Sequence, residues 1–369
     1  MSDLARAAIR RLRTGVVPNW ELAHFSVGYD PVKKLVEQSL GALGRDGKSS
    51  PLFARGEWGT GKSHFLSYVG TTAAGQWFAS ARIDLNARGV ALSHPQRFLP
   101  IIADSIHAGD HIGVQDLIPR LIHIAELRER MYAFSETTEA GDLGWAVRTL
   151  CDEFQDCGAL GLANHAAWAI LRGADLSWSD DATKREKALC RIAALARLCH
   201  AIGLKGLVLI LDEAETIDQL WNVRSRLSAY HVLGRLFEME SLWCALGSTF
   251  RFDRTLRSDL SNDVLATAVM TPAAKSFLQG WRREQYKIME PPAINRNGAH
   301  ELAHTITSLY QTAYSHRGEN GIRERCVDEW MRNPVRNPRR LIRLLVHRLD
   351  VSRKLTGAAT HAERAALNG

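Results

Sequence analysis

The stretch GEWGTGKS, residues 56–63, fits the pattern Gly-x-x-x-x-Gly-Lys-Ser, in which a glycine-rich loop opens a helix. Such a loop lets backbone N–H groups converge on phosphate oxygens, and the following helix adds the positive end of its dipole. Lys62 is expected to reach the β- and γ-phosphates, and Ser63 is expected to ligate Mg²⁺. The stretch predicts a phosphate cradle made of Gly56, Glu57, Trp58, Gly59, Thr60, Gly61, Lys62, Ser63 and His64.

The residues around this loop supply the strand–loop–helix context that the pattern requires. Residues 51–55, PLFAR, form a short strand candidate with a proline at its start, and residues 63–73, SHFLSYVGTTA, continue as a helix. The pattern alone is short enough to occur by chance. A second motif is therefore needed before it predicts nucleotide binding.

That second motif is LVLILDEAE, residues 207–215, in which five apolar residues end in Asp212-Glu213. A buried parallel strand would bring this acidic pair to the carboxyl edge of the sheet, where ligands bind in open α/β folds. Asp212 would hold Mg²⁺ directly or through water, and Glu213 would act on the attacking water as a general base or by orienting it. The alternative is that the pair caps the next helix. Both motifs in this order predict binding and hydrolysis of a nucleotide.

Two further features fit a nucleotide site. The strand candidate at residues 241–250 ends in Ser248 and Thr249, whose hydroxyls could reach the γ-phosphate or its water; the alternative is a plain strand-end cap. The stretch NPRRLIRLL opens a late helix with Arg339 and Arg340. Basic residues are unfavourable at the positive end of a helix dipole, which favours an anionic partner, the γ-phosphate, over a simple basic helix start.

The hydrophobic pattern predicts an α/β fold. Strand candidates alternate with helical segments, which implies a parallel sheet of about five strands covered by helices. The predicted strands are residues 51–55, 77–85, 204–215, 241–250 and 284–291. Residues 94–203 are mostly helical, and helices are also predicted at 298–315, 319–332 and 337–354, followed by a frayed tail.

Composition narrows the class of protein without defining it. The 47 basic residues, most of them arginine, exceed the 40 acidic ones and give a net charge of +7, which permits nucleic-acid binding without showing it. An amphipathic helix at residues 4–13 puts Arg6, Arg10 and Arg13 on one face, for docking or for phosphate contacts. Six cysteines without a Cys-x-x-Cys pair, and no signal or membrane segment, predict a cytoplasmic protein with reduced thiols.

These motifs together resemble the AAA+ ATPases, particularly the branch near the origin-recognition and STAND proteins. Residues 26–40, SVGYDPVKKLVEQSL, look like the adenine-side segment of that branch, with Gly28 before the helix. Four stretches resemble the ATP-binding proteins of bacteriophage-exclusion (BREX) systems of the BrxC/BrxD type. They are AIRRLRTGVVPNWELAHFSVGYD (8–30), GEWGTGKSHFLSYV (56–69), ARIDLNARGVALSHPQRFL (81–99) and LVLILDEAETI (207–217).

The resemblance implies an ATP- and Mg²⁺-dependent ATPase of antiphage defence. It implies a homo-oligomer acting on DNA with partners of the helicase or methyltransferase type, and an arginine supplied in trans. Arg283, next to Arg282, is the preferred candidate for that arginine, and Arg254 and Arg257 are its rivals. It also implies an N-terminal segment (1–29), an AAA+-like core (30–292) with a helical insertion at about 94–203, and a C-terminal helical lid (293–369).

Three functions stay open at this point. The first is an oligomeric ATPase that remodels or loads partners on DNA. The second is a slow ATP-dependent switch or scaffold that recruits protein partners. The third, a phosphotransferase, is less favoured because Glu213 follows Asp212 and because arginines open the lid helix.

Overall fold

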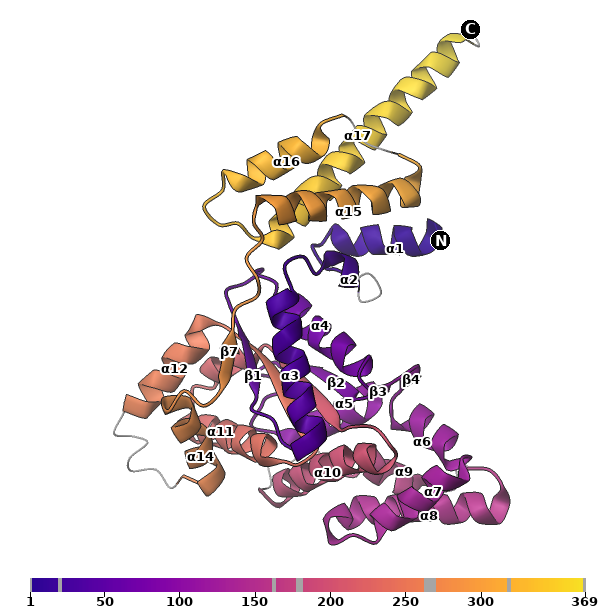
Figure 1. Cartoon of the computed structure of the whole chain (residues 1–369), viewed down its shortest axis with the longest axis vertical. Helices are drawn as coiled ribbons and strands as arrows, with labels where there is room; N and C mark the ends of the chain where they lie inside the picture. The colour runs from indigo at the N-terminus through magenta and orange to yellow at the C-terminus, as the bar shows by residue number, and fades with distance from the viewer. Residues whose placement is uncertain are drawn as a thin grey trace. The chain divides into compact units, whose positions relative to one another are not determined.

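The computed structural model of the chain describes residues 2–18, 22–160, 164–176, 182–261, 270–316 and 320–367. The chain divides into two compact units (Figure 1). We call residues 1–32, 56–68 and 291–369 the lid unit, and residues 33–55 and 69–290 the sheet unit. This division does not decide the predicted boundaries at residues 29 and 292, which stay predictions.

The sheet unit is a mixed α/β structure built on a seven-stranded sheet in the order β4-β3-β2-β5-β6-β1-β7. Five strands are parallel and correspond to the five predicted ones, whereas β3 and β4 pair antiparallel at one edge. The prediction of about five parallel strands therefore missed two. The strands are β1 (Leu52–Arg55), β2 (Ala79–Asp84), β3 (His107–Ala108), β4 (His111–Ile112), β5 (Leu207–Asp212), β6 (Leu242–Ser248) and β7 (Lys287–Met289).

The two central strands carry polar residues only where they reach the carboxyl edge. Every residue of β5 and β6 is buried, as expected for apolar strands covered on both faces. β5 ends at Asp212 and β6 at Ser248, and Ser248 pairs in register with Arg55 at the end of β1. The ends of β1 and β6 therefore lie side by side, with β5 next to β6.

Helices of the sheet unit share one hydrophobic core with its strands. The helical stretch predicted at 94–203 contributes many residues to this core, so it is an added layer of core. The helices are α5 (Pro95–Ser105), α6 (Val114–Ile122), α7 (Ala125–Ser135), α8 (Gly141–Cys157), α9 (His165–Leu171), α10 (Ala182–Ala201), α11 (Val223–Glu238), α12 (Phe250–Ser261) and α14 (Pro272–Arg282), with 3₁₀ turns η2 (Thr138–Ala140) and η3 (Ala214–Gln219). Helices α3 (Asp30–Asp46) and α4 (Lys62–Ala74) each run from the lid unit into the sheet unit.

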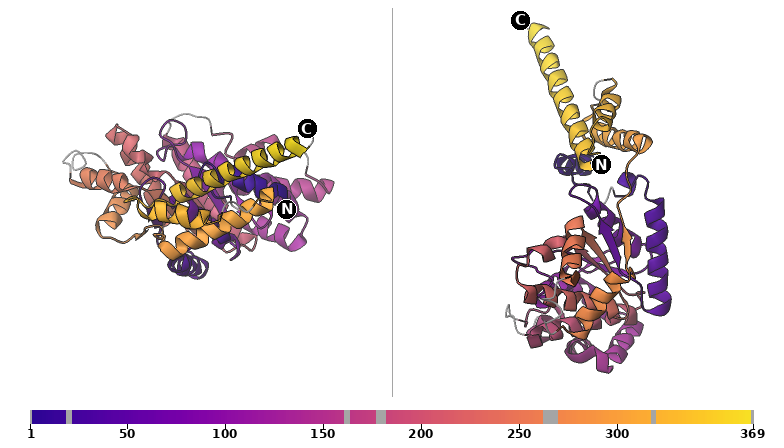
Figure 2. Two further views of the ribbon diagram at one scale, coloured as in Figure 1. Left: turned by 90° about the horizontal axis from the view of Figure 1, so that it is seen from above. Right: turned by 90° about the vertical axis from the view of Figure 1, so that its left-hand side faces the viewer.

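The lid unit has a separate core, formed by helices from both ends of the chain (Figure 2). Arg13, directly after α1, pairs with Asp350 of α17 at 2.8 Å, and Arg6 donates to the carbonyl of Ala313 at 3.0 Å. Two of the three arginines expected on the basic face of α1 therefore make internal contacts. The helices are α1 (Ser2–Leu12), α2 (Leu22–Phe25), α15 (Arg296–Tyr314), α16 (Ile322–Met331) and α17 (Pro338–Leu367). Helix α17 thus continues through the segment predicted to be a frayed tail.

All six cysteines lie in the described residues as free thiols. Cys151, Cys199, Cys244 and Cys326 are buried free thiols, whereas Cys157 and Cys190 are exposed free thiols. Within the described ranges no helix is long and apolar enough to cross a membrane, and no three His, Cys, Asp or Glu side chains gather as a metal cluster.

Candidate nucleotide-binding site

The glycine-rich loop holds its lysine in place. Strand β1 ends at Arg55, the loop follows, and α4 begins at Lys62. Gly59 and Gly61 have φ values of +80° and +104°, which side chains other than glycine rarely adopt. The Lys62 ammonium is buried, and it donates to the carbonyl oxygens of Gly56 and Glu57 at 2.9 and 3.3 Å. The loop therefore closes around a positive charge. This charge would attract the phosphates of a nucleotide.

Trp58 stands at the rim of this loop and is 65% exposed. Its ring centroid lies 5.6 Å from Lys62 Nζ, a cation–π distance. The exposed indole beside the lysine gives the loop a natural fluorescence reporter, because a ligand that draws Lys62 away changes the surroundings of the ring.

Asn337 joins the lid helix α17 to the loop within the lid unit. As the residue before Pro338, it caps the helix by accepting the N–H of Arg339 at 2.8 Å. Its Nδ2 also donates to the carbonyl of Trp58 at 3.3 Å. A Cβ placed on Gly59 would lie only 2.1 Å from this Nδ2, so the loop glycine is needed for the close approach. The amino end of α17 is therefore anchored on the loop.

Arg339 and Arg340 follow this cap in the first turn of α17, and both are exposed. The aliphatic part of Arg339 packs on Gly15, where an added Cβ would lie 2.3 Å from Arg339 Cγ. Two cations at the positive end of a long helix are unfavourable without an anion. Their position is therefore consistent with the predicted phosphate contact.

The segment before α3 packs on the first turn of α4. Ser26 Oγ and His64 Nε2 form a hydrogen bond of 3.1 Å, and the ring of Tyr29 meets His64 edge-on at 5.2 Å. Burial lowers the pKa of His64 to about 4, so this ring is neutral at physiological pH. Gly28 has φ +76°, and a Cβ added to it would lie 3.8 Å from Cβ of Pro292. This places the predicted adenine-side residue beside the loop's own helix.

In the sheet unit, the acidic pair lies where it was predicted, at the carboxyl end of β5. Asp212 is 3% exposed, and its Oδ1 accepts the backbone N–H of Glu213 at 2.9 Å. Its Oδ2 accepts a hydrogen bond from Nη2 of Arg82, on the neighbouring strand β2, at 2.6 Å. The Asp212 carboxylate is therefore oriented from both sides.

Glu213 has a backbone conformation that is uncommon for a residue with a side chain, with φ +62°. Four other described residues share this feature, namely Trp77, Ser241, Glu284 and Ser315. Each of those four follows a helix, where a left-handed residue is an ordinary ending. Glu213 instead follows a strand, so its conformation turns the chain directly after Asp212. Strain at such a position is typical of functional sites.

The end of β6 supplies buried hydroxyls. Ser248 and Thr249 are 0% and 2% exposed, and neither hydroxyl oxygen has a hydrogen-bond partner in the described residues. A buried hydroxyl without a partner costs free energy and is expected to meet a ligand or water. Beside them, Arg55 pairs with Asp253 of α12 at 2.8 Å.

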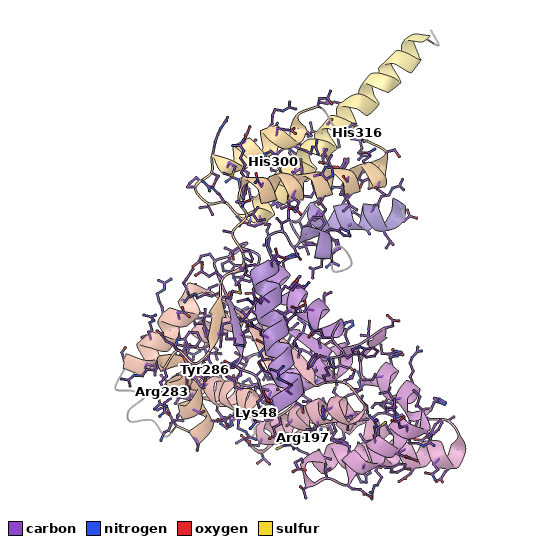
Figure 3. All side chains as sticks on the ribbon, viewed as in Figure 1. Lys48, Arg197, Arg283, Tyr286, His300 and His316 are labelled. Carbon is purple, nitrogen blue, oxygen red and sulfur yellow. The ribbon has the colours of Figure 1, made fainter. Side chains whose placement is uncertain are left out.

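The candidate trans-acting arginines lie at different edges of the sheet unit. Arg283 is exposed between α14 and the amino end of β7, near Tyr286 (Figure 3). Arg254 and Arg257 are exposed on α12, which begins just after the carboxyl end of β6. Arg254 and Arg257 therefore lie on the helix that follows the carboxyl edge of the sheet, whereas Arg283 lies near the amino end of β7.

Sequence reasoning missed two residues of this region. Asn337 had a visible signal, because Asn-Pro is a strong start of a helix, but its second contact, to the loop, depends on tertiary structure. Arg82 had no signal, because its pairing depends on the register in which Asp84 of β2 lies beside Asp212 of β5.

The features described above define a class of nucleotide-binding α/β proteins. These features are a glycine-rich loop, an acidic pair after a buried parallel strand, and a helical unit with arginines. Within that class, the sequence model of the family described as BREX system ATP-binding protein BrxC/D matches residues 2–99 and 181–364. The chain belongs to this family, whose description makes it an ATP-binding protein of a BREX antiphage system. Residues 100–180, within the helical stretch, lie outside the match. A search of curated proteins gives no match.

Proposed function

We propose that this protein is an AAA+-like ATPase of BREX defence that hydrolyses ATP with Mg²⁺ and, as a homo-oligomer, remodels or loads partners on DNA. Residues 56–63 bind the phosphates, with Lys62 on the β- and γ-phosphates and His64 in the first turn of α4. Gly28 flanks the adenine, and Ser248 and Arg339 contact the γ-phosphate. An arginine from a second copy, Arg283 or a rival on α12, completes the site.

The donor set at the two motifs fits Mg²⁺, which prefers oxygen ligands and is usually bound by one or two carboxylates together with substrate phosphates. Ser63 and Asp212 would hold it. When bound, the metal neutralises charge on the phosphates and orients them for in-line attack. Glu213 orients the attacking water and accepts its proton. The strand order β7-β1-β6-β5-β2 supports this reading, because it puts the loop strand, the hydroxyl-ending strand and the acidic strand in succession.

The observation that carries the proposal is the position of Lys62, whose buried ammonium lies against the carbonyls of its own loop. Replacing Lys62 with alanine is expected to weaken ATP binding by about 10- to 100-fold, because a charge-assisted hydrogen bond contributes about 1.5–3 kcal/mol. Equilibrium binding of ATP, followed by isothermal titration calorimetry, measures it. Lys48→Ala is the matched control, since Lys48 (Figure 3) is an exposed lysine with a long surface pair of 3.8 Å to Glu240. Equal affinities of the two variants would remove the loop from the proposal.

The oligomeric ATPase differs from the switch in how turnover depends on concentration. If an arginine acts in trans, ATP turnover per chain is expected to rise steeply with protein concentration, because such an arginine is worth about 10³–10⁵ in rate. Duplex DNA is expected to raise turnover further. The measurement is steady-state phosphate release over a dilution series with and without duplex DNA.

A flat and slow rate would instead favour the second candidate, a nucleotide-held switch that recruits protein partners, for which helicase or methyltransferase types are proposed. The contact of Asn337 with the loop favours this candidate, because it gives the lid helix a direct means of sensing the loop. ATP-dependent capture of a partner at a low turnover rate would support it.

A further inference from the structure

Arg82 is the cation nearest to the predicted metal ligand in the sheet unit, and the sheet register puts it there. Asp84 lies beside Asp212, and Arg82 lies beside Ile210, two residues earlier on each strand. Alternate residues of a strand share a face, so Arg82, Asp84 and Asp212 point to the same side of the sheet. The guanidinium reaches along that face to both carboxylates.

The pair is built into the sheet. Asp212 has a side chain that is 4% exposed, and Arg82 has one that is 32% exposed. Arg82 Nη2 donates to Asp212 Oδ2 at 2.6 Å, and Arg82 Nε donates to Asp84 Oδ1 at 3.1 Å. A buried carboxylate with its partner removed is strongly unfavourable. In the absence of a metal, Arg82 therefore supplies the charge that Asp212 requires.

A divalent metal at Asp212 would have to share that carboxylate with a guanidinium. Two cations a few ångströms apart repel each other at the effective dielectric of a protein surface, and the repulsion is stronger there than in bulk water. The phosphates of ATP would add the negative charge that offsets this repulsion. Mg²⁺ is in any case bound mainly through substrate phosphates at sites with few carboxylates.

We propose that Arg82 is a positioning residue that competes with a divalent metal for Asp212. A divalent metal therefore binds there only together with a nucleotide. The inference rests on the proposed function for the identity of that nucleotide. Arg82 holds the Asp212 carboxylate in one orientation and cancels its charge. When a nucleotide binds together with a metal, the guanidinium would turn away from Asp212 and toward Asp84, to which it already donates through Nε.

The test is binding of Mn²⁺ without nucleotide, followed by electron paramagnetic resonance at about pH 8, where a carboxylate stays ionised. The native chain is expected to bind Mn²⁺ weakly. Arg82→Gln is expected to bind it about tenfold more tightly or better, because the competing charge is gone. Arg82→Lys, which keeps the charge, is expected to restore the weak binding. Adding Asp212→Asn to Arg82→Gln is expected to abolish the gain.

Arg172→Gln serves as the matched control, because Arg172 pairs with Asp104 through two bonds of 3.0 Å in the same unit. It should leave Mn²⁺ affinity unchanged. If Arg82→Gln does not fold, as judged by its thermal transition, Arg82→Met keeps the aliphatic length and takes its place. Unchanged or weaker Mn²⁺ binding in the folded Arg82 variant would overturn the proposal and leave the pair structural. Because no ATP is present, a failure here is distinct from a failure of the native chain to bind ATP, which would overturn the proposed function.

Discussion

Glu213→Gln is expected to lower ATP turnover by about 10²–10⁴-fold, the usual contribution of a general base, while ATP binding is retained. The reason is that the amide can neither accept the proton of the attacking water nor hold it in the same orientation. The position supports the role, because Glu213 directly follows Asp212 on a left-handed turn that no helix ending explains. Single-turnover phosphate release, with ATP binding measured separately, distinguishes the two effects.

The chain offers a matched control in Glu284, a glutamate with φ +54° that follows α14. Glu284→Gln should leave turnover unchanged. Glycine at either position relieves backbone strain and is expected to raise the free energy of unfolding by about 1 kcal/mol, but only Glu213→Gly should stop turnover. Full turnover in Glu213→Gln would exclude Glu213 as the base and leave Asp212–Glu213 as a metal-binding and capping pair.

The longer strands could be predicted because local pattern and tertiary structure agree. Residues 207–211 are an uninterrupted apolar run, and the structure buries all of them in the centre of the sheet. The short strands β3 and β4 could not be predicted, because two residues carry no periodicity and their pairing is purely tertiary. His107 and His111, whose i, i+4 spacing would also fit one face of a helix, lie in these two strands. Helix α17 extends beyond its predicted end at residue 354, into the segment predicted to be a frayed tail.

The candidate site was predictable to the extent that it consists of contiguous sequence. The loop at 56–63 and the pair Asp212–Glu213 are such stretches, and each lies at the end of a predicted strand. Arg82 and Asn337 were missed because each gains its meaning from a residue far away in the chain, 130 and 279 positions distant. For Arg13 the sequence left docking and phosphate contact open, and the structure gives it Asp350 of the same unit as a partner.

Arg191→Ala is expected to lower the free energy of unfolding by about 3 kcal/mol, because it removes the buried guanidinium from two carboxylates, of which Asp142 keeps its pair with Lys187. The Arg191 side chain is 1% exposed and lies on α10 within the core of the sheet unit. Its Nη2 donates to Asp142 Oδ2 of α8 at 2.6 Å and to Asp175 Oδ2, after α9, at 2.7 Å. One guanidinium thus joins three segments of the helical stretch. Urea unfolding followed by circular dichroism measures the loss.

The pH dependence of that loss distinguishes an ion pair from simple packing. Burial raises the pKa of Asp142, but hydrogen bonds from Arg191 and Lys187 outweigh it and hold this pKa below its ordinary value. A depressed pKa stabilises the folded state at pH values above the unfolded pKa, near pH 4, and this contribution is lost as pH falls through the folded pKa. The difference between the native chain and Arg191→Ala should therefore shrink below about pH 4. Arg172→Ala, which breaks the exposed pair with Asp104, should cost less than about 1 kcal/mol. A difference that does not change with pH would mean that Arg191 acts through its packing and not through its charge.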